Sequence, residues 1–131
     1  MKVKKNILVV DDDLDLLEQM TSILSAAGYQ VVPAEGHAAA EDLMLKSRPD
    51  LAIVDLMMEE KDSGFVLSYE LKKLYPDLPV IMLTAVTGAT GLSFASPSAE
   101  AKSWTMVDKL MDKPVRAEQL KAEVRRLLHE E

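Results

Sequence analysis

Carboxylate, hydroxyl and ammonium side chains follow short apolar segments along this sequence. In chain order they are Asp11 and Asp12 after Ile7–Val10, Asp55 after Leu51–Val54, Thr84 after Val80–Leu83, and Lys113 after a weaker apolar segment near Lys109–Met111. Three carboxylates in one pocket repel one another unless a cation joins them, and a site with few protein oxygen ligands suits Mg²⁺. A lysine and a hydroxyl beside such a metal supply a point charge and a hydrogen bond for a phosphoryl group. An aspartate in that setting can act as a nucleophile and form an acyl phosphate.

The segments before these residues have the composition of buried strands, and the chain between them has the spacing of helices. Five apolar segments, counting Val31–Val32, alternate with stretches where apolar residues recur every three or four positions. The expected helices are marked by Leu17, Met20, Leu24 and Ala27 before Gly28, by Ala38–Lys46, by Leu67, Leu71 and Leu74 before Pro76, and by Leu120, Val124, Leu127 and Leu128 after Pro114. This alternation predicts a five-stranded, parallel, doubly wound α/β fold in a single domain. In such a fold the site lies beyond the carboxyl ends of the strands, so the five polar residues should converge there.

Composition and charge narrow the classes of partner. The chain has 131 residues, no cysteine and a formal net charge of −7. Without cysteine it forms no disulfide and no thiolate metal site, so any metal must be held by oxygen or histidine. The negative charge argues against direct nucleic-acid binding, and the apolar runs are too short for a membrane-spanning or secretory segment. We therefore expect a cytoplasmic protein that binds another protein or a cation, with no nucleic-acid partner and no membrane.

Four sequence motifs, ILVVDDD, LAIVDLMM, VIMLTA and DKPV, occur in this order along the chain. Each motif alone is weak, but the combination at these intervals is highly specific and covers nearly the whole chain. The sequence resembles the receiver domain of two-component response regulators, which has a flavodoxin-like fold. The resemblance implies that residues 1–131 form one receiver domain with no output domain in this chain. It also implies that Asp55 accepts a phosphoryl group from a histidine kinase or phosphotransfer protein, which then switches binding to an unidentified protein target.

The same resemblance implies a role for each residue of the site. Asp12 would bind Mg²⁺, or Mn²⁺ in its place, directly, and Asp11 would bind it mainly through water. The backbone carbonyl of Met57 would complete the protein ligands beside the phosphoacceptor. Thr84 would follow the phosphoryl group, and Lys113 would pair with the phosphate, with a cis peptide bond expected after this lysine. The chemistry would be self-phosphorylation and self-dephosphorylation, so we expect a signalling module and not an enzyme.

The chain departs from the usual receiver pattern at three positions and in one loop. Glu59 stands where relatives carry a proline, Gly64 falls one position later than usual, and Leu110 stands where they use an aromatic residue as a rotamer switch. The stretch between the fourth and fifth strands is longer than in ordinary receivers. It is rich in Gly, Ala, Ser and Thr, with a short helix expected near Ser98–Trp104. The hypothesis is that this loop is itself the switch and becomes ordered when Thr84 bonds the phosphoryl group.

Other residues and other functions have plainer interpretations. Asp13 is expected to cap the first helix and not to bind metal, because an aspartate at that position accepts the unpaired amide hydrogens. His37 and His129 lie in polar contexts near helix ends and are expected to be solvated. A degenerate receiver that acts as an unphosphorylated adaptor is one alternative function. A small Mg²⁺-dependent phosphatase with Asp55 as nucleophile is another, but such enzymes commonly carry a second aspartate where this chain has Met57.

Overall fold

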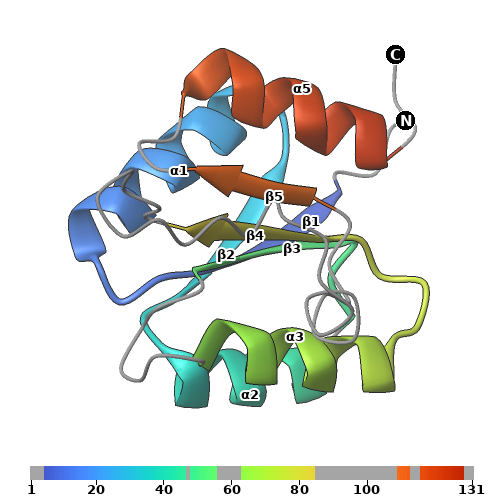
Figure 1. Ribbon diagram of the computed structural model, residues 1–131. Coiled ribbons are helices and arrows are strands. Elements are labelled where there is room, and N and C mark those ends of the chain that lie inside the picture. The colour runs from blue at the N-terminus through green and yellow to red at the C-terminus, as the bar shows by residue number, and fades with distance from the viewer. Residues whose placement is uncertain (1–4, 47, 56–62, 85–108, 113–115, 129–131) are drawn as a thin grey trace, which may run out of the picture.

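The computed structural model describes residues 5–46, 48–55, 63–84, 109–112 and 116–128 of the chain. Strands and helices alternate (Figure 1): β1 Asn6–Val10, α1 Leu14–Ala26, β2 Gln30–Ala34, α2 His37–Lys46, β3 Leu51–Asp55, α3 Ser63–Leu74, β4 Val80–Thr84, β5 Lys109–Asp112 and α5 Ala117–Leu127. All strand pairs are parallel, in the spatial order β2-β1-β3-β4-β5. The predicted five-stranded doubly wound α/β fold is confirmed.

Helices cover both faces of the sheet (Figure 1). α1 and α5 lie on one face, and α2 and α3 lie on the other. The side chains of β1 explain this arrangement, because successive residues of a strand point to opposite faces. Ile7 and Val9 pack in one apolar core with α1 and α5, whereas Leu8 and Val10 pack in a second core with α2 and α3. β3, in the middle of the sheet, is buried along its whole length, as its apolar sequence predicts.

Short polar signals set the two ends of α1. The Asp13 carboxylate accepts hydrogen bonds from the backbone N–H groups of Asp15 and Leu16, at 3.1 and 3.3 Å. At the other end Gly28 has φ 99°, in the left-handed region that costs a residue with a Cβ about 1–2 kcal/mol. Asp13 is therefore the N-cap, as predicted, and Gly28 ends the helix. This capping fixes the start of α1 directly after the aspartates that follow β1.

The register of the sheet determines which polar residues lie side by side. β1 and β3 are neighbours, with Val10 paired to Val54, and the strand order reverses at this point. Asp11 and Asp55, each one residue further along, therefore lie at the same carboxyl edge. On the other side of β3, the end of β4 brings Thr84 to this edge as well. The switch point of the sheet is thus where ligands are expected to bind.

Two further expectations concern helices. Of the helices that the structure describes, none combines the length and the apolar composition that crossing a bilayer requires. The short helix expected near Ser98–Trp104 belongs to the stretch 85–108, which lies outside the described residues.

Candidate functional site

Three carboxylates meet at the carboxyl edge of the sheet and are called the aspartate triad below. Asp11 and Asp12 follow β1, and Asp55 is the last residue of β3. One oxygen from each carboxylate lies within 4.8 Å of the other two. Asp11 is fully buried and Asp55 is 3% exposed, whereas Asp12 is exposed. The structure therefore brings together three of the residues that the sequence predicted for the site, and Asp12 gives the group access to solvent.

Backbone hydrogen bonds hold the buried end of the triad in place. The Asp11 N–H donates to the carbonyl oxygen of Ala34 at 3.1 Å, which continues the pairing of β1 with β2 by one residue. Oδ1 of Asp11 accepts from the N–H of Asp13 at 2.9 Å. The chain that leaves β1 is thus anchored at Asp11 and capped at Asp13. Asp12, between these two fixed points, is exposed to solvent.

Burial and mutual repulsion make it costly to ionise the carboxylates of the triad. Transferring a carboxylate out of water costs several kcal/mol, and a second carboxylate nearby adds repulsion. A divalent ion relieves both penalties. Mg²⁺ fits this donor set, because it prefers oxygen ligands and is commonly bound through one or two carboxylates while it keeps several waters. Asp11, Asp12 and Asp55 are the described residues that would hold it.

The remaining predicted site residues are placed only in part. Thr84 ends β4 and pairs in register with Asp112 at the end of β5, so its backbone lies at the same edge as the triad. The side chain of Thr84 is not among the described parts of the structure. Met57 and Lys113, with the cis peptide bond expected after the lysine, lie outside the described residues. The roles of these three residues stay predictions.

The departures from the usual receiver pattern are also placed in part. Gly64 lies in the first turn of α3, and Leu110 lies in β5. Glu59 lies outside the described residues, as does the loop between β4 and β5. The hypothesis that this loop is the switch therefore stays a prediction.

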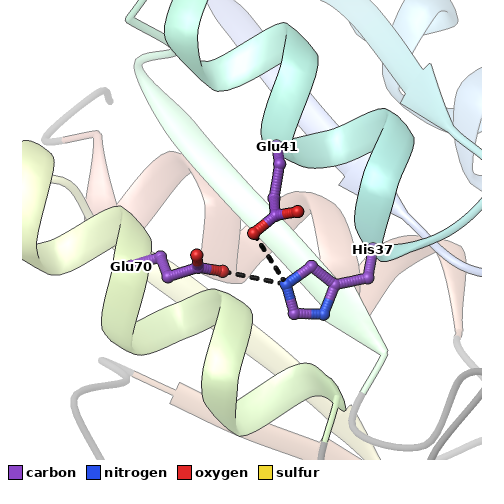
Figure 2. A group of neighbouring side chains, drawn as sticks. All are labelled: His37, Glu41 and Glu70. Atoms are coloured by element: carbon purple, nitrogen blue, oxygen red, sulfur yellow. Dashed lines mark hydrogen bonds and ion pairs between the residues drawn. The ribbon is translucent and has the colours of Figure 1, made fainter.

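A second group of ionisable side chains, which the sequence did not predict, joins α2 to α3 (Figure 2). Nε2 of His37 lies 2.8 Å from Oε1 of Glu70 and 3.3 Å from Oε2 of Glu41, and these three residues are called the α2–α3 cluster below. The His37 side chain is only 20% exposed, so the prediction that it is solvated is wrong. The partner, Glu70, lies 33 residues away on a neighbouring helix, so the residues next to His37 in sequence do not reveal it. His129 lies outside the described residues.

The members of the α2–α3 cluster change one another's titration. Partial burial disfavours the charged imidazole, but the hydrogen bond with Glu70 and the charge of Glu41 outweigh burial and raise the pKa of His37. The hydrogen bond with Glu70 raises the pKa of Glu41, and burial raises it further. Both shifts favour the protonated forms of His37 and Glu41.

Comparison with known proteins finds transcriptional regulators. The chain is 37% identical, over 84% of its length, to the transcriptional regulatory protein GlrR of Escherichia coli strain K12, of which it covers 23%. It spans half or less of the length of curated relatives of this kind. The prediction that excluded a nucleic-acid partner is therefore wrong, because relatives are named as transcriptional regulators. The net charge of −7 describes this segment alone and carries no information about the rest of such proteins.

Solved structures and a family model agree on the fold. A receiver domain protein described as CheY-like, from Methanospirillum hungatei, matches with a TM-score of 0.82 and 25% identity, over 97% of this chain and 95% of that one. The response regulator TrrA from Thermotoga maritima, solved in complex with Mg²⁺-BeF, matches with a TM-score of 0.75 and 28% identity, over 94% of this chain and 98% of that one. The family model described as the response regulator receiver domain matches residues 7–125. The predicted resemblance is thereby confirmed, and the chain belongs to the receiver domain family of two-component response regulators, which are signalling modules.

Proposed function

We propose that this protein accepts a phosphoryl group on Asp55 from a histidine kinase or phosphotransfer protein, and that the modification changes its binding to a protein partner. The placement of Asp55 carries the proposal. Its carboxylate is 3% exposed and lies within 4.8 Å of two others, at the point where the strand order reverses. In doubly wound sheets this is the crevice where ligands bind. A nucleophile at this point meets a donor that approaches from the exposed side, over Asp12.

The transfer forms one bond and breaks one. A carboxylate oxygen of Asp55 attacks the phosphorus of the donor, and the bond from phosphorus to the donor histidine nitrogen breaks. The electron pair of that bond stays on the nitrogen, and the product on this chain is an acyl phosphate. Asp11 and Asp12 would hold Mg²⁺, or Mn²⁺, beside the acceptor. When bound, the ion neutralises charge on the phosphoryl oxygens.

Properties of the family support this assignment. Receiver domains bind Mg²⁺ at an acidic pocket, and the triad supplies one here. The TrrA structure holds Mg²⁺-BeF, and beryllofluoride is a chemical mimic of a phosphoryl group. By resemblance we assign the backbone carbonyl of Met57 to the metal, the Thr84 hydroxyl to the transferred phosphoryl group and the Lys113 ammonium to the phosphate. We place this activity in a single receiver domain made of residues 1–131.

Phosphorylation by acetyl phosphate tests the proposal. In the presence of Mg²⁺ the intact protein should gain the mass of one phosphoryl group, and Asp55→Asn should abolish the gain. Asp13→Asn is the matched control, because it makes the same chemical change next to the triad and asparagine caps a helix about as well as aspartate. This control should be phosphorylated like the wild type. Chelation of Mg²⁺ should prevent phosphorylation of the wild type and of Asp13→Asn.

Other outcomes point to the alternative functions. Phosphorylation of Asp55→Asn at the wild-type level would contradict the choice of acceptor. If the wild type binds Mg²⁺ but takes no phosphoryl group from acetyl phosphate or from histidine kinases, it acts as an unphosphorylated adaptor. Continuous turnover of a generic phosphate ester would identify it as a phosphatase.

A further inference from the structure

We propose that the α2–α3 cluster is a binding site for a divalent transition-metal ion of the zinc class, separate from the aspartate triad. The ligands are Nε2 of His37 and one carboxylate oxygen each from Glu41 and Glu70. These three atoms lie within 4.8 Å of one another. In Figure 2 both carboxylates point toward the same imidazole nitrogen, one from α2 and one from α3. This site goes beyond the phosphorylation of Asp55 and does not depend on it.

The spacing of the ligand atoms fits a tetrahedral metal site. Zn²⁺ binds histidine nitrogen and carboxylate oxygen at about 2.0–2.2 Å, which places neighbouring ligand atoms about 3.4 Å apart in a tetrahedron. Nε2 of His37 lies 3.3 Å from Oε2 of Glu41 and 2.8 Å from Oε1 of Glu70. The first distance already matches, and the second requires a small outward movement of one flexible glutamate.

The chemistry of the donors selects the class of ion. Imidazole suits Zn²⁺ and other late transition metals, whereas Mg²⁺ and Ca²⁺ prefer sites made of oxygen alone. His37 and Glu41 are four residues apart on α2, a spacing that places two ligands on one face of a helix. Glu70 supplies the third ligand from α3. The three side chains are 20%, 40% and 33% exposed, so an ion can enter from solvent and keep a water molecule in the fourth position.

Electrostatics also favours a cation between the two helices. One carboxylate oxygen each of Glu41 and Glu70 lies within 4.8 Å of the other and of Nε2 of His37, so two ionised glutamates place negative charge at one point. Nε2 of His37, which faces both carboxylates, can bind a cation through its lone pair when it carries no proton. As pH rises and the proton leaves, a metal ion can take its place. Metal and proton therefore compete for Nε2 of His37.

An ion in this position would connect the N-terminal part of α2 to α3. At the C-terminal end of the pair, the hydroxyl of Tyr75 donates to the carbonyl oxygen of Met44 at 2.6 Å. This second link involves none of the proposed ligands. It provides a substitution, Tyr75→Phe, that loosens the contact of α2 with the end of α3 and leaves the ligand set intact.

Calorimetric titration of the whole chain with Zn²⁺ tests the site, with Mg²⁺ at saturating concentration so that the triad is occupied. We expect one equivalent of Zn²⁺ to bind the wild type. Zn²⁺ affinity should fall at least about tenfold in each of the variants His37→Gln, Glu41→Gln and Glu70→Gln. Even substitution of a residue that only hydrogen-bonds to a metal ligand lowers metal affinity by about this much. Two controls should bind like the wild type. They are Tyr75→Phe and Glu118→Gln, which removes one charge from a glutamate that is 90% exposed on α5.

A spectroscopic readout does not depend on the stability of these variants. The chain has two histidines, so His129→Gln leaves His37 as the single imidazole. Its ring nitrogen signals should shift when Zn²⁺ is added, and the affinity should fall as pH is lowered. The proposal is overturned if each of the three ligand variants binds Zn²⁺ as tightly as the wild type. It is also overturned if Glu118→Gln weakens Zn²⁺ binding as much as the ligand variants do. Loss of Zn²⁺ binding in Asp12→Asn, which would place the ion in the triad, overturns it too, as does an imidazole that responds to pH but not to Zn²⁺.

Discussion

The aspartate triad and the α2–α3 cluster each gather three ionisable side chains within 4.8 Å, but they are built in opposite ways. The triad lies at the ends of two neighbouring strands, and two of its three carboxylates are buried. The cluster joins the surfaces of two helices, and all of its side chains are partly exposed. The triad consists of carboxylates alone. The cluster includes an imidazole, which can carry a positive charge of its own.

This difference decides where each group obtains its counter-charge. The carboxylates of the triad carry the same charge and cannot neutralise one another, so a cation bound between them would supply the opposite charge. The cluster compensates itself whenever His37 is protonated, and solvent screens what remains. The proposed Mg²⁺ would therefore meet no competing positive charge within the first group. In the second group a metal ion competes with a proton.

Mg²⁺ should separate the two groups by the largest effect. At a free concentration of about 100 times its Kd, an ion that binds only the folded protein raises the free energy of unfolding by about 2.7 kcal/mol. We expect Asp12→Asn to remove most of this gain, because it takes one carboxylate from the triad. Glu70→Gln should keep the gain. Urea unfolding with and without Mg²⁺ measures both, and an equal loss in the two variants would show that the groups are not independent.

The triad could be predicted from sequence because its geometry follows from strand order. Asp11 and Asp55 each stand directly after an apolar run, Asp12 follows Asp11, and neighbouring parallel strands end at one edge of a sheet. Because β1 pairs with β3 and Val10 is opposite Val54, the next residues, Asp11 and Asp55, lie side by side at the carboxyl edge of the sheet. Capping by Asp13 was predictable for the same reason, since it depends on a few adjacent residues.

The α2–α3 cluster could not be predicted because it depends on how two helices pack. The spacing of His37 and Glu41 places them on one face of α2, but the approach of Glu70 requires the rotation of α3 about its own axis. That rotation is set by the apolar side chains beneath both helices, including Ala40, Met44, Leu67 and Leu71. The error about nucleic acid has a different cause, because the net charge of a receiver domain is not the net charge of a regulator that contains one.

Substitution of Asp13 should sharpen the boundary of the triad. Asp13→Ala removes the acceptor for two backbone N–H groups at the start of α1, so the free energy of unfolding should fall by about 1 kcal/mol. The gain from Mg²⁺ should stay at its wild-type size, because Asp13 caps the helix and binds no metal. Denaturant unfolding at several Mg²⁺ concentrations distinguishes the two contributions. A smaller gain from Mg²⁺ in Asp13→Ala would extend the metal site to the third aspartate.

The pH dependence of the α2–α3 cluster is the smallest effect, well below about 1 kcal/mol because its members are partly exposed. The pKa of His37 is raised by the two glutamates, so folding favours its charged form. This contribution to stability is complete below about pH 6.5 and is lost as pH rises through the raised pKa. In a chelator, the difference in unfolding free energy between wild type and His37→Gln should therefore shrink as pH rises above about 6.5 and through the raised pKa of His37. A constant difference would mean that folding does not change the pKa of His37. Added Zn²⁺ should restore the difference at high pH, because the proposed ion binds Nε2 once the proton has left.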